Sequence, residues 1–557
     1  MIENGNIVSE LAEARLSPHL GTPGGQRGTG THGGGKPWEA SPVAKNCLVG
    51  GFALMVVYMG VRALITATTR PFWFDEVCTW TIVQQPGISG VWNALRHAAD
   101  GQPLGFYLVE KIPRLFVAHD EIALRIPTVL AFCAVMLCVF TWIRTACGSI
   151  VAWISCLFLL FSPLRNYYAT EARPYVLVAA CLAFALVCYQ RVDRRAFVVL
   201  LALTLAAAEC FHYYAIFLVF PFGVAEAAFL LRNHKFRVGV WLALCSPMVP
   251  LLAFLPLLSR LKAAYGASFW AQPMASETLN VYSWLIGASE MSLPQTLPGR
   301  LLVIGSFLGA TVFLMIRLAK DFSDNRPRLN ETALLLGLLV SPWVMYLSLR
   351  LAHGGLTVRY MLPFTVTIPL VLAQFLVMLN RRTLHLIAGV LFLLLAVLEV
   401  SFWKYSLPME REAFTPVKLL DSLLRQAGHP DLPVLISNPV DYLSLVHYAS
   451  PPLASRLVEP LDTSAEFAYA QTDNLGKNLM AIAPYTQLNL PAYRDFQAQH
   501  EVFLLYTTSR RGTERMDWWT RRLRHDGVAM QTLAQWGDAE VYLVTLPESR
   551  TKGDPRD

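Results

Sequence analysis

The sequence predicts an α-helical protein that crosses a membrane many times and carries a small α/β domain at its C-terminal end. Of the 557 residues, 54% are hydrophobic and only 15% are charged, a balance that soluble domains rarely show. Apolar runs long enough to cross a bilayer recur between residues 47 and 403. After residue 404 the apolar segments become short and alternate with polar ones, as in a water-exposed domain.

Residues 1–45 are polar and rich in glycine, most densely between Gly21 and Lys36. Such a segment has too few apolar groups to offset the entropy that ordering costs, so we expect a disordered tail on the cytoplasmic side. The first apolar run, Cys47 to Thr68, is longer than the core of a signal peptide. We therefore expect it to be retained as a helix.

Eleven apolar runs are expected to form a transmembrane domain over residues 46–405. Several lie near the short end of the range for a spanning helix, so the expected count is ten to thirteen. The runs cover residues 47–68, 122–142, 149–164, 174–189, 196–211, 213–231, 238–258, 301–317, 332–350, 360–379 and 384–403.

Positive charges gather in the short connections on one side of this bundle, and connections rich in Lys and Arg stay cytoplasmic. An odd count of helices then puts the long loop 69–121 and the C-terminal domain outside. We expect a multi-pass protein of the inner (plasma) membrane, with a cytoplasmic N-terminus and an extracytoplasmic C-terminal domain. The basic residues of these connections are Arg144, Arg191, Arg194, Arg195, Arg232, Lys235, Arg237, Arg317, Lys320, Arg326, Arg328, Arg381 and Arg382.

The formal net charge of +7 is thus a sign of topology, and we expect no nucleic-acid partner. Ten cysteines are present, with no CxxC pair and none after Cys245. Most lie inside apolar runs, where a thiol packs as a small hydrophobic group. Neither a disulfide framework nor a metal site is predicted.

Residues 406–557 are predicted to form the small extracytoplasmic α/β domain. A helix is expected from Thr415 and Pro416 to Gly428, and a second from Met516 to His525. Short apolar segments predict strands at 432–437, 501–508 and 540–546. The segment shows no catalytic motif.

The loop 69–121 holds the strongest candidate for chemistry, the acidic pair Asp75 and Glu76. The pair follows the first membrane run and lies among bulky aromatic residues, which also favour one or two interfacial helices. Partial loss of water at that depth would raise the proton affinity of a carboxylate and suit Asp75 to general-base work. We expect Asp100, Asp120 and Glu121 to be mostly solvated.

Three further polar segments lie at the outer ends of apolar runs. Glu171 and Arg173 either pair structurally or hold a charged substrate group. His212 is more often a structural, hydrogen-bonded residue at such a place. Arg359 either reaches lipid headgroups or binds phosphate, whose oxygens match the planar guanidinium.

All of these segments project to one side of the membrane, so an outward-facing chamber with a carboxylate, arginines and aromatic residues is predicted. Such a site suits transfer from a phosphate-linked donor. The leaving phosphate needs positive charge, and the acceptor hydroxyl must lose its proton to a base.

These motifs resemble the GT-C superfamily of membrane glycosyltransferases, in the branch that holds protein O-mannosyltransferases, lipid A aminoarabinose transferases and the bacterial RgtA/B/C/D-like enzymes. The resemblance covers residues 50–405. It rests on Phe74-Asp75-Glu76, on Arg125-Ile-Pro127, on the segment 169–175 and on the segment 359–363. The chain departs from the relatives at Gln102-Pro103-Leu104-Gly105-Phe106-Tyr107, where they often have a histidine.

The resemblance implies an inverting glycosyltransferase that moves a sugar from a polyprenyl-phosphate donor to an acceptor hydroxyl on the outer face. Membrane lipids are expected partners, and the acceptor is an unidentified glycan, lipid or protein. Asp75 would be the catalytic base, with Glu76 as its neighbour. The donor phosphate or sugar would contact Glu171, Arg173, Tyr175, Arg359 and Tyr360, and the candidate acceptor or substrate contacts are Asp100, Gln102, His212 and Tyr213.

The leading alternative is a secondary transporter or flippase of a glycolipid or anionic substrate. Transporters usually show repeated halves and broken helices at matching positions, and no such repeat is visible. We expect no cofactor. A divalent metal, which one branch of the superfamily uses, has no compact set of acids and histidines here to bind it.

Overall fold

The computed structural model describes residues 42–162, 167–266, 269–283, 296–324, 329–407, 416–508 and 516–547. The chain divides into two compact units, Met1–Asn46 and Cys47–Asp557, and the second contains the helices from Cys47 onward and the sheet. Residues 1–41 of the disordered tail predicted over residues 1–45 lie outside the described residues. The prediction is wrong for residues 42–45, because they form the first turn of α1 (Pro42–Ala67).

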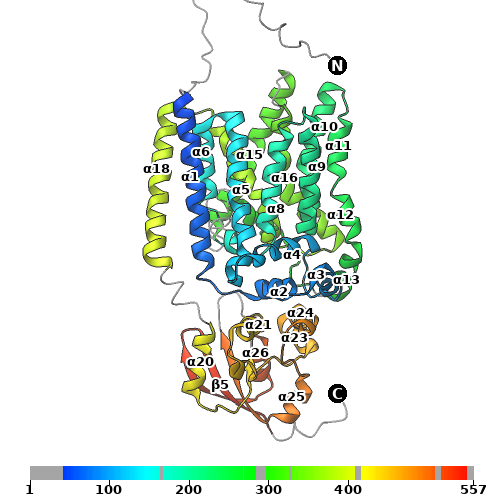
Figure 1. The fold of residues 1–557 in the computed structure, drawn as a ribbon, viewed down its shortest axis with the longest axis vertical. Coiled ribbons are helices and arrows are strands. Elements are labelled where there is room, and N and C mark those ends of the chain that lie inside the picture. Colours follow the sequence, from blue (N-terminus) through cyan, green and yellow to red (C-terminus); the bar gives the residue numbers. More distant parts are fainter. Residues whose placement is uncertain are drawn as a thin grey trace, which may run out of the picture. The chain divides into compact units, whose positions relative to one another are not determined.

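Long apolar helices run side by side in the first two-thirds of the second unit (Figure 1). In the described ranges, seven helical segments are long and apolar enough to cross a membrane, and one further pair of helices passes the same test together but is bent. Besides α1, the longer and shorter α-helices of the bundle together are α5 (Asp120–Cys147), α6 (Ser149–Leu159), α8 (Tyr175–Tyr189), α9 (Arg195–Phe211), α10 (Val219–Asn233), α11 (Val238–Cys245), α12 (Met248–Ala253), α13 (Leu255–Tyr265), α15 (Leu297–Ser323), α16 (Leu329–Ala352), α17 (Thr367–Leu376) and α18 (Arg381–Ser401).

The polytopic helical membrane fold predicted from composition is therefore confirmed. Each of the eleven apolar runs is helical for most of its length, while the number of crossings stays a prediction. Short helical segments complete the bundle. They are the 3-10 helices η2 (Tyr168–Thr170), η3 (Tyr213–Leu218) and η5 (Val358–Val366), the π-helix η6 (Phe402–Ser406) and the α-helix α14 (Ala275–Ser283).

The run expected to be continuous over 238–258 is broken. Its two halves, Val238–Ala253 and Leu255–Tyr265, meet at an angle of 60°. Pro247, Pro250 and Pro256 lie around the bend. Each proline lacks a backbone N–H and its ring crowds the preceding turn, so three of them in ten residues favour a broken helix.

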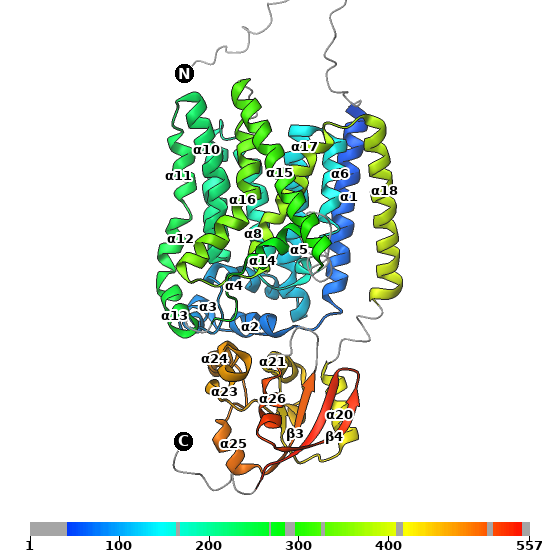
Figure 2. The same cartoon turned by 180° about the vertical axis from the view of Figure 1, so that it is seen from behind.

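The first loop, for which the aromatic residues favoured one or two helices, forms three short α-helices and a 3-10 segment across one end of the bundle (Figures 1 and 2). Helix α4 packs against α9, and a Cβ atom added at Gly105 would lie 2.7 Å from the Cβ of Cys210. Only glycine allows this close approach. The loop elements are α2 (Phe74–Val83), α3 (Gly87–Arg96), α4 (Leu104–Lys111) and η1 (Pro113–Leu115).

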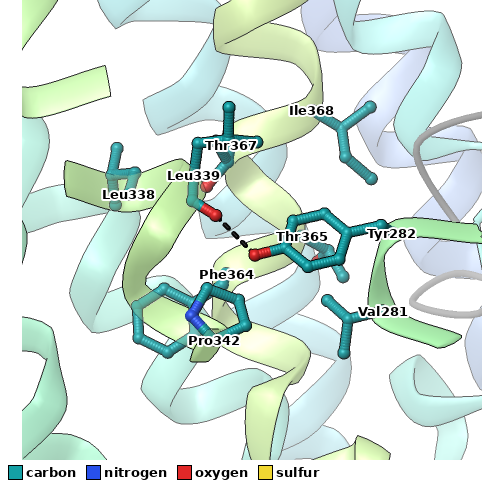
Figure 3. A pocket seen from close by; sticks show the side chains of 9 residues that line it. All are labelled: Val281, Tyr282, Leu338, Leu339, Pro342, Phe364, Thr365, Thr367 and Ile368. Carbon is teal, nitrogen blue, oxygen red and sulfur yellow. Dashed lines mark hydrogen bonds between the residues drawn. The ribbon is translucent and has the colours of Figure 1, made fainter. Parts of the chain in front are cut away.

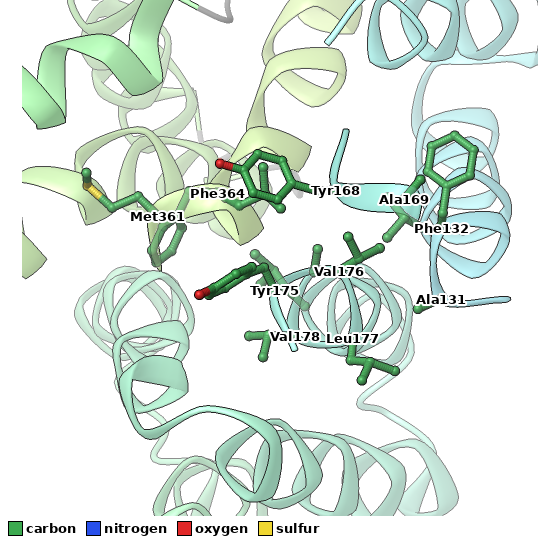
Figure 4. Packing of buried hydrophobic residues seen from close by; sticks show 14 of the residues in the cluster. Ala131, Phe132, Tyr168, Ala169, Tyr175, Val176, Leu177, Val178, Met361 and Phe364 are labelled. Atoms are coloured by element: carbon green, nitrogen blue, oxygen red, sulfur yellow. The ribbon is translucent and has the colours of Figure 1, made fainter. Parts of the chain in front are cut away.

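The centre of the bundle is filled by apolar and aromatic side chains from segments far apart in the sequence. Phe132 from α5, Val176 from α8 and Phe364 from η5 belong to one buried cluster (Figure 4). All ten cysteines are in the described part, and none of them forms a disulfide there.

The C-terminal region, residues 416–547, contains a five-stranded sheet with the order β2-β1-β3-β5-β4. Strand β1 is parallel to β2 and β3, whereas β5 is antiparallel to β3 and β4. In the register, Leu504 lies opposite Val434 and Leu543. The strands are β1 (Val434–Ile436), β2 (Leu457–Val458), β3 (Val502–Thr508), β4 (Ala529–Trp536) and β5 (Ala539–Thr545).

The three predicted strands are present, and two were missed. Strand β2 has only two residues, and in β4 apolar and polar residues do not alternate regularly and most are unburied, so neither has a strong strand signal. The predicted helices are α20 (Pro416–Ala427) and α26 (Trp518–His525). The helices without a prediction are α21 (Pro439–Tyr448), α22 (Pro451–Ala454), α23 (Thr463–Ala470), α24 (Asn474–Ile482), η7 (Ala483–Tyr485) and α25 (Tyr493–Gln499).

Candidate active site

Helix α2 begins next to the end of α1 and carries Asp75 and Glu76 in its first turn. Acidic residues in a first turn are favoured because the backbone N–H groups there lack helical partners. Glu76 accepts a bond of 3.4 Å from the N–H of Trp73, which caps the helix. Successive helical residues point about 100° apart, so the two neighbouring carboxylates face different surroundings.

Glu76 points into the protein and is held by Arg125 of α5. The guanidinium donates through Nε to Oε1 at 2.8 Å and through Nη2 to Oε2 at 2.7 Å, and both side chains are at most 2% exposed. The same guanidinium donates to the carbonyl oxygens of residues 67, 70 and 71. Glu76 also accepts from the N–H of Ala172 at 2.8 Å. This buried pair fixes α2 relative to α1, α5 and the segment before α8.

Asp75 faces two guanidinium groups from distant parts of the chain. Its Oδ2 lies 3.0 Å from Nη1 of Arg359 and 3.8 Å from Nε of Arg173. The Asp75 side chain keeps 17% exposure, so it is accessible to a ligand. The Nε atoms of both arginines are buried and have no hydrogen-bond partner among the described residues. The three groups predicted to form the centre of the site are therefore brought together.

Arg173 is oriented by Asp100, which we expected from the sequence to be mostly solvated. That expectation is wrong, because Asp100 is 8% exposed and its Oδ2 lies 2.6 Å from Nη1 of Arg173. Nη1 also donates to the Thr79 hydroxyl and to the Asp75 carbonyl, each at 3.2 Å. The buried guanidinium of Arg173 needs such partners, and the carboxylate of Asp100 supplies one.

Asp120 and Glu121 are each partly buried and hydrogen-bonded. Asp120 accepts from Trp80 at 2.7 Å and from Arg114 at 2.9 Å. Glu121 accepts from the hydroxyl of Tyr448 at 2.9 Å. The expectation of solvated side chains is therefore too simple for both residues, because each helps to hold the loop.

Glu171 lies in the loop before α8 and is 2% exposed, and neither carboxyl oxygen has a hydrogen-bond partner among the described residues. Burial raises the pKa of Glu171 to about 8, and the charge of Glu76 adds to the rise, while Arg359 opposes it. Burying a carboxyl group without a hydrogen-bond partner is costly, so Glu171 is a candidate ligand contact.

Arg359 lies among aromatic rings. Its Cζ is 5.7 Å from the ring centroid of Trp73, 5.9 Å from that of Tyr175 and 5.6 Å from that of Trp270. Such contacts favour a guanidinium that is partly desolvated. The Arg359 side chain is 18% exposed, so it can still reach a ligand.

Aromatic rings next to this centre surround a small cavity. Ring centroids lie 5.7 Å apart for Tyr175 and His212, and 5.1 Å apart for His212 and Tyr360. Tyr214 closes the same wall, 5.4 Å from Tyr360. The cavity thus joins three of the predicted site residues with Tyr214, which sequence reasoning did not assign.

His212 is neutral in this setting, because burial and, to a smaller extent, the charges of Arg173 and Arg359 together lower its pKa to about 3. Its Nδ1 accepts from the backbone N–H of Tyr214 at 3.1 Å, which leaves the proton on Nε2. Tyr213 and Gln102 are buried but do not line the cavity, and each has a side-chain oxygen without a hydrogen-bond partner in the described ranges.

A second cavity, between α14, α16 and η5, is mainly apolar (Figure 3). The hydroxyl of Tyr282 donates to the carbonyl oxygen of Leu339 at 2.6 Å. Its lining has no acid, base or histidine, so it offers no group for proton transfer.

No group of three His, Cys, Asp or Glu residues that could hold a metal ion occurs in the part of the chain that the structure describes. Asp75, Glu76 and Asp100 are instead paired with arginines. Sequence reasoning missed the part that Thr79 and Trp270 play at the site. Arg125 was noted only as part of a motif, and the sequence did not show that it is buried and paired with Glu76.

The model of one protein family, described as dolichyl-phosphate-mannose-protein mannosyltransferase, matches residues 97–259. No curated protein matches the chain. Among solved structures, the chain is similar to ArnT from Cupriavidus metallidurans bound to undecaprenyl phosphate, with 12% identity, a TM-score of 0.50 and coverage of 90% of this chain and 99% of that one. The apo state of the same ArnT gives 13% identity, a TM-score of 0.42 and coverage of 91% and 100%.

The matched segment contains Arg125, Glu171, Arg173 and His212, so the family model covers much of the site but not Asp75 or Arg359. The structural similarity extends over nearly the whole of both chains. Together these findings agree with the resemblance seen in the motifs: the chain has the fold of ArnT over most of its length, and residues 97–259 match the mannosyltransferase family model.

Proposed function

We propose that this protein is an integral membrane glycosyltransferase that moves a sugar from a polyprenyl-phosphate donor to an acceptor hydroxyl on the outer face of the inner membrane. The reaction is an inverting single displacement with Asp75 as the general base. The observation that carries the proposal is the meeting of Asp75, Arg173 and Arg359, three residues far apart in the sequence, in one partly exposed cluster.

The two arginines suit a phosphate ligand. A guanidinium offers five N–H donors in a plane, and here the Nε atoms of both arginines lack partners among the described residues. Oδ2 of Asp75 lies at Arg359 where an oxygen of an anionic ligand could bind. A phosphate group that binds there would replace the carboxylate as the partner of Arg359 and leave Asp75 free to accept a proton.

The chemical step then balances without a further reactant. The acceptor oxygen forms a bond to the anomeric carbon as the bond between that carbon and the phosphate oxygen breaks. The acceptor proton passes to Asp75, and the leaving phosphate keeps the electron pair and is stabilised by Arg173 and Arg359. A positioned base of this kind contributes about 10²–10⁴-fold, and fixed positive charge at the leaving oxygens adds to it.

The remaining residues support these three. Glu171 has carboxyl oxygens available to hydrogen-bond a sugar hydroxyl or to orient Arg173. Glu76 acts as a positioning residue through Arg125. Tyr175, Tyr360 and His212 line the cavity next to Arg359, where sugar or lipid carbon atoms can pack on aromatic rings. Asp100, Gln102 and Tyr213 remain candidate acceptor or substrate contacts.

The donor class is supported by the ArnT that was solved with undecaprenyl phosphate, whose fold this chain shares. Positive charges in the short connections support a cytoplasmic N-terminus and an extracytoplasmic face for the loop that carries Asp75. The acceptor is a glycan, lipid or protein with a free hydroxyl group.

The purified protein, given a radiolabelled polyprenyl-phosphate sugar and a membrane extract as the source of acceptor, tests the proposal. We expect label to move to an acceptor with the wild type and with Asp421→Asn, a change at an exposed acid paired with Arg425. Asp75→Asn should reduce that transfer by about 10²-fold or more, the effect of losing a general base. Label that crosses sealed vesicles unchanged, with no labelled acceptor, would instead identify a flippase.

A further inference from the structure

The C-terminal region contacts the segments that carry the candidate catalytic acids, and the contacts are made by hydrogen bonds as well as by packing. Helix α21 packs on α2, and α24 packs on α13. Two residues of this region, Tyr448 and Asn478, each bond to two separate parts of the chain around the first loop. The mechanism above does not use either residue.

Tyr448, at the end of α21, forms hydrogen bonds both to the segment just before α2 and to α5. Its hydroxyl accepts from the backbone N–H of Phe72 at 2.7 Å and donates to Oε1 of Glu121 at 2.9 Å. The neighbouring His447 packs edge-on against Trp80 of α2, with ring centroids 4.5 Å apart. Residues 447 and 448 of the C-terminal region therefore contact both the segment just before α2 and a side chain of α2 itself.

Asn478 of α24 links α2 to the turn that precedes Asp100. Its Oδ1 accepts from the thiol of Cys78 at 3.4 Å, and its Nδ2 donates to the carbonyl oxygen of Ala99 at 3.1 Å. Cys78 is three residues after Asp75, and Ala99 directly precedes Asp100. A single amide thus spans the two loop segments whose acids contact Arg173.

The turn before Asp100 needs such support because its backbone is strained. Ala98 has a φ of +58°, a left-handed conformation that is sterically unfavourable for a residue with a Cβ atom. Three hydroxyl or amide groups hold the turn: Tyr485 bonds to Nδ1 of His97 at 2.8 Å, Tyr265 donates to the carbonyl oxygen of Ala98 at 2.8 Å, and Asn478 donates to that of the next residue. Two of the three belong to the C-terminal region.

We infer that the C-terminal region is a positioning element of the active site, in which Tyr448 and Asn478 hold α2 and the 97–100 turn so that Asp75 and Asp100 both face Arg173. The description of these acids as catalytic or substrate-binding rests on the proposed function. The mechanical coupling between the two regions does not.

Hydrogen exchange followed by mass spectrometry on the full chain tests this coupling. In Tyr448→Phe and in Asn478→Leu we expect amide exchange in residues 74–83 and 97–101 to rise about fivefold, the factor that corresponds to the loss of one hydrogen bond. Tyr442→Phe is the matched control on the same helix, since its hydroxyl also bonds to one N–H and one oxygen, both of Asn489 inside the C-terminal region. This control should leave both loop segments unchanged.

A rise confined to the amide of Phe72, or no rise at 74–83 and 97–101, would overturn the inference. Should Asn478→Leu fail to fold, the conservative Tyr448→Phe decides the matter. In the transfer assay we expect kcat to fall about tenfold in either variant, with the KM for the donor within about threefold, because neither residue touches Arg359. If the wild type transferred no sugar, the exchange result would still decide the coupling, so the two proposals fail separately.

Discussion

Replacing Asp75 with asparagine should act in opposite directions on binding and on catalysis. The carboxylate is 3.0 Å from Nη1 of Arg359 and 3.8 Å from Nε of Arg173, so it competes with an incoming phosphate for the same donors. Asparagine has nearly the same shape but no charge. We therefore expect the Asp75→Asn variant to bind undecaprenyl phosphate more tightly than the wild type while it loses transfer.

The expected change in affinity follows from the loss of the ion pair between Asp75 and Arg359. A hydrogen bond to a charged group contributes about 1.5–3 kcal/mol, and tenfold in affinity corresponds to about 1.4 kcal/mol. The amide oxygen of asparagine can still accept one bond from Arg359, which favours the lower end of the range. Kd for undecaprenyl phosphate should accordingly fall about tenfold. Loss of a general base should lower kcat by about 10²–10⁴-fold.

Titration of undecaprenyl phosphate into the protein in lipid nanodiscs, followed by tryptophan fluorescence, measures the affinity, because Trp73 and Trp270 lie beside Arg359. Asp421→Asn serves as the control and should leave both Kd and kcat unchanged. A Kd that rises in Asp75→Asn would refute the idea that this carboxylate occupies the phosphate position. A kcat within threefold of the wild type would refute its assignment as the base.

Three other substitutions test neighbouring parts of the site. Arg125→Leu leaves the buried Glu76 carboxylate unpaired and should destabilise the protein by about 3–5 kcal/mol in a denaturant or thermal unfolding assay, whereas the double change with Glu76→Leu should recover much of the loss. Arg173→Lys keeps the charge but not the planar fork held by Asp100, so donor affinity in the same titration should fall about tenfold, and equal affinity would argue against a phosphate contact. The pKa of Glu171 is raised to about 8 in the fold, above its ordinary 4.5, so its contribution to stability is complete below about pH 4.5 and is lost as pH rises through 8. Across this range the Tm of the wild type should fall relative to Glu171→Gln, by an amount that corresponds to roughly 5 kcal/mol over the full titration, and parallel curves would contradict the burial of this carboxyl group.

The membrane fold could be predicted because its cause is local. A run of about twenty apolar residues has few alternatives to a buried or spanning helix, whatever the rest of the chain does. The break in the run 238–258 was not predicted, although its three prolines were visible, because prolines in membrane helices are often accommodated without a bend. In the C-terminal region, strand β4 was missed because its apolar and polar residues do not alternate with the period of two that marks a half-buried strand.

The candidate site was predicted in part. Asp75, Arg173 and Arg359 were expected on one side of the membrane, and the structure brings their side chains into contact. The roles of Asp100 and Glu76 were not foreseen. Both depend on partners 73 and 49 residues away in the sequence, Arg173 and Arg125, and no local pattern reveals which buried guanidinium a carboxylate will meet.

The amino-acid sequence by itself determined that this chain is a polytopic helical membrane protein and that acids, arginines and aromatic residues lie at the ends of its apolar runs. Composition and hydropathy are sums over neighbouring residues, so they need no knowledge of the fold. Only the tertiary structure decided that Glu76 is locked to Arg125 while Asp75 stays accessible beside Arg359, and that Tyr448 and Asn478 reach the first loop. The reason is physical: hydrogen bonds and ion pairs act over about 3 Å in space, and which groups come that close is set by the packing of the whole chain.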